Sequence, residues 1–195
     1  MKLLSLCEII FQCALFALII FHVFKREFKL MKSVILVFVL SFLPELLNAL
    51  FRIRVDAFSI FVYFIIIFMA LYLGSSFLFY DKYKWWDRAI HFLSGIGFAG
   101  FGIAIAGTNS GIMKLVVLLL GFTFPITLHV IWEVLEYLSD CITHGNAQRW
   151  QKINASNNHV SEKAIQPAGL VDTMNDAICC IAGSGLAVLI WWFVI

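Results

Sequence analysis

Long apolar segments alternate with short polar stretches along the whole chain. Six of these segments hold the roughly 20 mostly apolar residues that a helix needs to cross the hydrocarbon core of a bilayer. Backbone groups inside lipid must find hydrogen-bond partners within their own segment, so each segment is predicted to be helical. The predicted spans are residues 3–24, 33–51, 57–79, 88–106, 114–138 and 170–194. The pattern therefore predicts an all-α, polytopic membrane bundle that forms a single transmembrane domain over residues 1–195.

The composition agrees with a membrane protein and excludes most soluble classes. Of the 195 residues, 62% are hydrophobic and 13% are charged, whereas soluble domains contain roughly 45–50% and 25%. The formal net charge of +2 is small for a nucleic-acid binder, so no nucleic-acid partner is expected. The five cysteines lack the spacing of a structural metal site and are interpreted as packing residues.

One polar stretch, residues 141–168, separates the last two predicted spans. It is rich in Asn, Ser, Gln and His, and it is long for a connection between helices. Two interpretations stay open for this stretch. It is either a solvated cytoplasmic loop or a lid over whatever lies beneath it.

Ionisable side chains within a membrane span are costly, so each of them is a candidate functional residue. In the fifth span they follow one another at intervals of four, three and four residues, which places them along one face of the helix. These residues are His129, Glu133, Glu136 and Asp140. The same face continues through Gly121 and Pro125, and small residues of this kind line the contacts between membrane helices.

The fourth and sixth spans repeat this arrangement of a polar end and a small-residue stripe. Asp87 and His91 are four residues apart in the fourth span, and Asp172 and Asp176 are four apart in the sixth. The stripes that continue these faces are Gly95, Ala99 and Gly102 in the fourth span and Cys180, Gly183 and Ala187 in the sixth. Because small residues let helices approach closely, the three spans are predicted to pack against one another.

Depth in the membrane decides whether the polar ends can meet. A helix rises about 1.5 Å per residue, so depth can be counted from one membrane face. His91 then lies about 5 Å inside the fourth span, Glu133 about 8 Å inside the fifth, and Asp176 about 9 Å inside the sixth. These three side chains are therefore predicted to lie within about 10 Å of one another. Glu45, about 18 Å inside the second span, is too deep to join them. It is interpreted as a group that bridges helices, with a step of an ion path as the alternative.

Several carboxylates in one apolar layer repel one another unless a cation lies between them. Here the donors are carboxylates and imidazoles without thiolate, a set that suits Mg²⁺, Mn²⁺ or Zn²⁺. Iron is less favoured because the paired Glu-x-x-His signature of di-iron bundles is absent. The predicted metal ligands are Asp87, His129, Glu133, Asp140, Asp172 and Asp176, and the predicted general bases are His91 and Glu136. The alternative is that these groups only join helices through hydrogen bonds.

Several short motifs lie in the second half of the chain. They are Tyr80-Asp81-Lys82-Tyr83, Asp87-Arg88, His91-Phe92-Leu93-Ser94-Gly95, Trp132-Glu133-Val134-Leu135-Glu136-Tyr137 with Asp140, and Gly169-Leu170-Val171-Asp172-Thr173-Met174-Asn175-Asp176. In this combination the chain resembles the YjdF-like family of bacterial inner-membrane proteins, and more distantly the VanZ-like proteins. The resemblance implies a polytopic protein of the bacterial cytoplasmic membrane, and it implies no particular activity.

These observations lead to three functional hypotheses. The first is a metal-dependent hydrolase or transferase that acts on a lipid or isoprenoid head group at the cytoplasmic leaflet. The second is a small cation- or proton-coupled transporter, for which a homo-oligomer is expected because six helices leave little room for a pathway. The third is a non-catalytic membrane protein involved in envelope stress or drug resistance, as in the VanZ-like group.

The orientation in the membrane follows from the distribution of Lys and Arg, which are enriched in cytoplasmic loops. Four of these residues lie on one predicted side, namely Lys2, Arg52, Arg54 and Lys114. The ten on the other side are Lys25, Arg26, Lys29, Lys32, Lys82, Lys84, Arg88, Arg149, Lys152 and Lys163. Both termini are therefore predicted to lie outside the cytoplasm.

Reporter fusions test this orientation. An alkaline phosphatase fused to the C-terminus is expected to be active, because that enzyme folds only outside the cytoplasm, and a fluorescent protein at the same place is expected to stay dark. The same pair inserted within residues 141–168 should give the opposite result. A C-terminal fluorescent fusion that is bright, with an inactive phosphatase fusion, would reverse the predicted orientation.

Overall fold

The structure is a computed structural model that describes residues 2–107, 113–143 and 167–195. Within these residues the regular secondary structure is helical throughout, which confirms the all-α prediction. Six helical stretches are long and apolar enough to cross a membrane, as predicted. They are Leu6–Lys25, Phe28–Phe51, Ala57–Gly74, Trp86–Ala106, Lys114–Thr143 and Gly169–Val194. Most of the segment predicted as a loop or lid, residues 144–166, lies outside the described residues.

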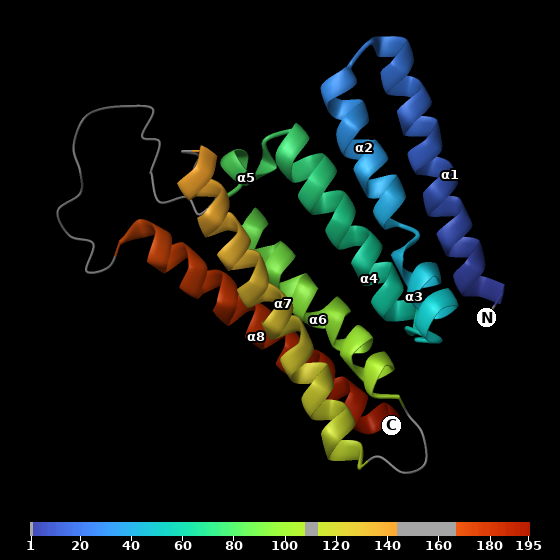
Figure 1. The fold of residues 1–195 in the computed structure, drawn as a ribbon, viewed down its shortest axis with the longest axis vertical. Coiled ribbons are helices and arrows are strands. Elements are labelled where there is room, and N and C mark those ends of the chain that lie inside the picture. Colours follow the sequence, from blue (N-terminus) through green and yellow to red (C-terminus); the bar gives the residue numbers. More distant parts are fainter. Residues whose placement is uncertain (1, 108–112, 144–166) are drawn as a thin grey trace.

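The first two spans form a hairpin (Figure 1). Helix α1 (Lys2–Lys25) is followed by Arg26, whose φ of 57° is left-handed. The Glu27 amide then donates to the His22 carbonyl, and the Arg26 amide donates to the Val23 carbonyl, which is the Schellman pattern of a helix end. This turn reverses the chain, so that α2 (Phe28–Leu40) packs along α1.

The second span is interrupted near Pro44, where it is broken into two helices. Helix α2 ends at Leu40, and α3 (Leu43–Phe51) begins three residues later with Pro44 in its first turn. Proline has no amide hydrogen, so the Leu40 carbonyl, four residues earlier, receives no helical bond from it. The Tyr63 hydroxyl, on the next span, donates to that carbonyl at 2.9 Å. The Leu40 carbonyl therefore has a hydrogen-bond partner despite the break in the helix.

The third span also differs from a regular helix. Helix α4 (Ala57–Ile67) begins at Asp56, whose carboxylate caps the helix by accepting from the Ser59 amide at 3.0 Å. It continues as the π-helix η1 (Phe68–Gly74), and a turn then leads into the short helix α5 (Phe79–Lys82). The spanning helix thus ends earlier than residue 79, where the prediction placed it.

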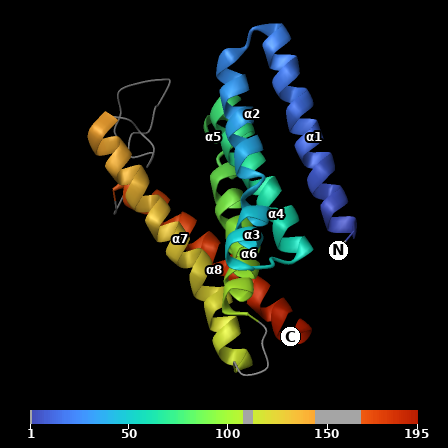
Figure 2. The same ribbon diagram turned by 45° about the vertical axis from the view of Figure 1, so that its right-hand side comes forward.

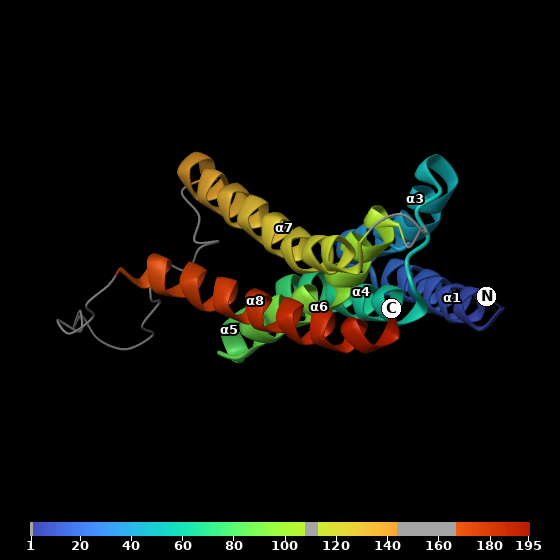
Figure 3. The ribbon, with the colours of Figure 1, turned by 90° about the horizontal axis from the view of Figure 1, so that it is seen from below.

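Helix α6 (Trp86–Ala106) lies at the centre of the bundle. It packs against α4 on one side, and on the other against α7 (Lys114–Thr143) and α8 (Ala168–Val194), which also pack against each other. Figures 2 and 3 show α7 and α8 flanking α6, with the α1–α2 hairpin on the far side of α4. Both termini lie toward the same end of the bundle, as an even number of spans requires (Figure 1).

Helices α6 and α8 approach each other closely at two glycines. A Cβ atom on Gly95 would collide with the Cys180 carbonyl oxygen, and one on Gly183 would collide with the Phe92 carbonyl oxygen. Where α6 packs against α7, a Cβ atom on Gly102 of α6 would collide with the backbone of α7. These contacts confirm the prediction that the small-residue stripes of the last three spans face one another.

The close approach yields a stability prediction with an internal control. Gly183→Ala is expected to destabilise the protein by about 1–3 kcal/mol, the usual cost of overpacking, because the added methyl group meets backbone that cannot rotate away. Gly185→Ala on the same helix is the control, since the nearest atom to its Cβ position, on Phe122, is 3.9 Å away. Thermal unfolding in detergent measures both. Equal stability of the two variants would contradict the described contact.

Candidate functional site

Two buried histidines face each other where α6 packs against α7. The Nδ1 atoms of His91 and His129 are 3.2 Å apart, and the rings meet at an angle of 80°. Both side chains are buried. Because one nitrogen of such a pair donates and the other accepts, at least one of the two imidazoles is neutral in this arrangement.

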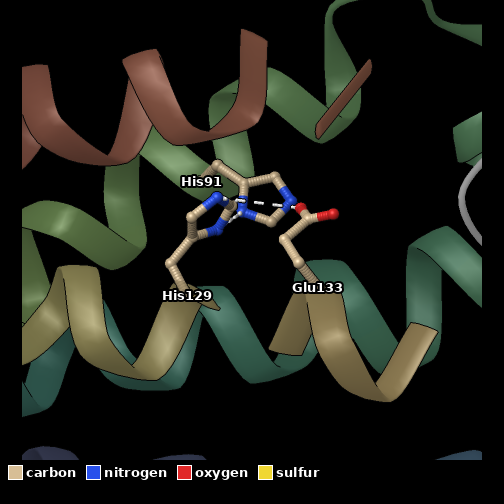
Figure 4. A group of neighbouring side chains, drawn as sticks. All are labelled: His91, His129 and Glu133. Carbon is tan, nitrogen blue, oxygen red and sulfur yellow. Dashed lines mark hydrogen bonds and ion pairs between the residues drawn. The ribbon is translucent and has the colours of Figure 1, made fainter. Parts of the chain in front are cut away.

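Glu133 brings a carboxylate to the same place. It lies one helical turn after His129 on α7, and its Oε1 atom is 3.7 Å from His129 Nε2. Figure 4 shows these three side chains, one from α6 and two from α7, pointing toward one another. The other oxygen of Glu133 accepts a hydrogen bond from the Thr173 hydroxyl of α8 at 2.8 Å. One carboxylate therefore connects two helices and keeps one oxygen directed at the histidines.

Two further carboxylates lie on the opposite side of the His91 ring. The Nε2 atom of His91 is 3.6 Å from Asp87 Oδ1 on the same helix and 4.0 Å from Asp176 Oδ2 on α8. Both distances exceed that of a normal hydrogen bond, so these contacts are ion-pair distances rather than direct bonds. His91 thus has a histidine beside one ring nitrogen and two carboxylates beside the other.

Local helix geometry explains this convergence. Residues four apart share a helix face, which aligns Asp87 with His91 and His129 with Glu133. Helix α8 reaches the same layer because the glycine contacts let it approach α6 closely. We call the five residues Asp87, His91, His129, Glu133 and Asp176 the polar cluster.

The polar cluster contains buried groups whose bonding is incomplete. His129 is 5% exposed, and its Nε2 atom is buried without a hydrogen-bond partner. Asp176 is 4% exposed, and among the described residues its polar contact is the 4.0 Å ion pair with His91. Leaving a buried carboxylate or imidazole nitrogen unbonded is costly in an apolar environment. Within the described residues, the His129 Nε2 atom is therefore left without the hydrogen bond that its burial calls for.

The distances within the polar cluster fit a bound cation. One ligand atom each from His91, His129 and Glu133 lie within 4.8 Å of one another, and the same holds for Asp87, His91 and Asp176. Two imidazole nitrogens bound to one tetrahedral Zn²⁺ at about 2.0–2.1 Å are separated by about 3.3 Å. The two Nδ1 atoms, 3.2 Å apart, already have this separation.

Five of the eight residues predicted as ligands or bases thus lie in the polar cluster, and three do not. Glu136 is half-buried and accepts a hydrogen bond from the Trp132 indole at 2.7 Å. Asp140 and Asp172 are half-buried and lie outside both ligand groups of the described residues. Glu45 is exposed on α3 and accepts from Gln12 of α1 at 3.3 Å, the helix-bridging contact that was its favoured interpretation.

Thr173 also contributes to this site, although its residue type did not mark it as a candidate in the sequence. Its hydroxyl carries no charge, so a search for ionisable residues passes over it. The signal that was present is its position three residues before Asp176, which puts both on one side of α8.

The protein is therefore a polytopic membrane protein with six membrane-spanning helices. Where three of these helices meet, it contains a buried site of imidazoles and carboxylates. Within that class, the chain belongs to the family described as "predicted membrane protein (DUF2238)", whose family profile matches residues 7–195. No curated protein and no solved structure matches the chain.

The hydrogen bond between Thr173 and Glu133 can be tested directly. Thr173→Val keeps the shape of the side chain and removes the hydroxyl, so it is expected to cost about 1.5–3 kcal/mol, typical of a hydrogen bond to a charged group. Thr173→Ser keeps the hydroxyl and should remain close to the wild type. Thermal unfolding of the metal-free protein measures the difference, and equal loss in both variants would contradict a role of the hydroxyl.

Proposed function

We propose that the protein is a metal-dependent membrane hydrolase or transferase that acts on a lipid or isoprenoid head group at the cytoplasmic leaflet. The observation that carries the proposal is the convergence of His91, His129 and Glu133, whose ligand atoms lie within 4.8 Å of one another. Two imidazoles and one carboxylate are the protein ligands of many catalytic zinc sites. This set favours Zn²⁺ over Mg²⁺ and Mn²⁺, since imidazole suits Zn²⁺ whereas Mg²⁺ and Mn²⁺ prefer oxygen ligands.

The depth of the polar cluster supports a substrate that reaches it from the membrane surface. His91 lies five residues after Trp86, where the span begins, which corresponds to about 8 Å along the helix. Asp176 lies seven residues after Gly169, or about 11 Å. A head group at the interface is thus close to the proposed metal, whereas a fully water-soluble substrate would have to enter lipid.

The chemistry expected of this site follows from its residues. A cation held by carboxylates and imidazoles can orient a phosphoryl or carbonyl oxygen and activate a water. His91 and Glu136 were both predicted as general bases. Glu136 keeps that role, because it lies one turn closer to the interface than Glu133 and outside the ligand groups, whereas His91 would be a metal ligand.

A second candidate function is a proton- or cation-coupled transporter. The specific observation that favours it is the sequence of contacts from Asp176 through His91 and His129 to Glu133, since chains of carboxylates and imidazoles relay protons across membranes. In that case the 3.2 Å contact between the two histidines carries a proton instead of flanking a metal. Proton uptake by vesicles that contain the protein, without added metal, distinguishes this candidate.

The setting of the proposed enzyme is also part of the proposal. We expect a bacterial cytoplasmic membrane with both termini outside the cytoplasm, membrane lipid as the partner, and a homo-oligomer if the transport candidate holds. The kinship to the YjdF-like and VanZ-like proteins belongs to the same proposal, and it favours a role in the cell envelope.

Metal binding and turnover are tested together on the purified protein. Zn²⁺ at 100 times its dissociation constant is expected to stabilise the wild type by about 2.7 kcal/mol, because the ion binds only the folded state. Glu133→Gln removes one charged ligand and keeps the shape, so this stabilisation should be largely lost. In vesicles that contain phosphatidic acid, phosphatidylglycerol or an isoprenoid diphosphate, release of the head group should require the metal and fail in Glu133→Gln.

Glu45→Gln is the matched control, because it removes a carboxylate outside the polar cluster and should change neither measurement. If Zn²⁺, Mn²⁺ and Mg²⁺ all leave the wild type unstabilised, the metal-dependent enzyme is ruled out. A Glu133→Gln variant that is as stable as the wild type, or more so, without metal would support simple hydrogen bonding between helices, because an amide both donates and accepts.

A further inference from the structure

The geometry points to a second divalent cation position, formed by Asp87, Asp176 and the Nε2 atom of His91, so that the His91 imidazole bridges two cations. This inference rests on the proposed function, which uses the other face of the same ring. The three ligand atoms lie within 4.8 Å of one another, two of the three side chains are buried and one is half-buried. They come from two helices, α6 and α8, that the glycine contacts hold together.

The separations around His91 Nε2 are wide enough to leave room for an ion. A hydrogen bond from an imidazole to a carboxylate spans about 2.7–3.0 Å. The observed separations are 3.6 Å to Asp87 and 4.0 Å to Asp176. Two ligand atoms that share a cation at about 2.0–2.2 Å lie roughly 3–3.5 Å apart, so a small inward movement of the carboxylates completes this geometry.

Asp176 supplies an independent observation. Its side chain is 5% exposed, and its polar contact within the described residues is the 4.0 Å ion pair with His91. A carboxylate buried in this way is costly unless it is paired or bound to a metal. The cation of the proposed function does not satisfy it, because that cation lies on the Nδ1 side of the His91 ring.

The charges of the polar cluster also favour two cations over one. Asp87, Glu133 and Asp176 contribute three negative charges when ionised, and one divalent cation leaves a net charge of −1 in an apolar layer. When the second cation binds, it replaces the proton on His91 Nε2, which leaves to water. The bridging imidazolate then adds a fourth negative charge, and two divalent cations neutralise the cluster. A neutral cluster is favoured in an apolar environment, because an uncompensated charge has a high free energy where the dielectric constant is low.

The distance across the ring sets what the second cation can do. With metal–nitrogen bonds of about 2.0–2.1 Å, two cations bridged by one imidazolate are about 6 Å apart. That is longer than the roughly 3.5–4 Å of sites in which two metals clamp one reacting oxygen. The second cation therefore contacts a different part of the head group from the one that reacts, such as the neighbouring phosphoryl group of a diphosphate.

Metal stoichiometry tests the inference. The purified full chain is stripped with a chelator, equilibrated with Zn²⁺ and analysed for bound zinc per folded chain, with folding checked by thermal unfolding. Two ions are expected for the wild type and for the control Glu45→Gln. One ion is expected for Asp176→Asn, which loses the second position, and one for Glu133→Gln, which loses the first. Loaded with Cu²⁺ instead, the wild type should show magnetic coupling between two ions that share an imidazolate, and Asp176→Asn should not.

The outcomes separate this inference from the proposed function. A single ion in the wild type that persists in Asp176→Asn overturns the second position and leaves the first intact. Two ions without magnetic coupling overturn the bridge through His91. No bound ion in the wild type overturns both proposals.

Discussion

The polar cluster depends on the close contact between α6 and α8. At Gly95 and Gly183 each helix backbone lies where the other's Cβ atom would be, which no larger residue permits. Only at that separation does Asp176 of α8 reach His91 of α6. The same contact encloses the ionisable groups in protein instead of lipid, where their desolvation would be uncompensated. The small residues that pack the helices together and the charged residues of the polar cluster therefore lie along the same helix interface.

The sequence predicts the number of spans well because hydropathy over about 20 residues reflects a strong physical constraint. It predicts their internal shape less well. The second span is apolar throughout, yet Pro44 interrupts it, and what makes the interruption tolerable is the Tyr63 hydroxyl from a different helix. The π-helix η1 has no signal in the hydropathy pattern, since a change of hydrogen-bond register leaves the apolar character unchanged.

The candidate site shows the same division between local and long-range information. Spacing by four residues placed Asp87 beside His91 and His129 beside Glu133, because that geometry belongs to a single helix. Depth along the helices correctly brought Asp176 to the same layer. Spacing alone does not determine how each helix is rotated about its axis relative to its neighbours. Glu136 is turned about 60° from Glu133 at 100° per residue, and it pairs with Trp132 instead of joining the histidines.

A third buried histidine shows what complete bonding looks like in this protein. His22, at the end of α1, is 2% exposed, and both of its ring nitrogens are bonded, to Glu27 at 2.7 Å and to the Tyr72 hydroxyl at 2.8 Å. The same fold thus brings a carboxylate and a hydroxyl to normal hydrogen-bond distance when an imidazole serves to join helices. In the polar cluster the imidazole–carboxylate distances are 3.6–4.0 Å, although these carboxylates are more buried than Glu27. Simple bridging of helices would be expected to close these gaps, so the imidazole–carboxylate contacts of the polar cluster are looser than the bonds of His22.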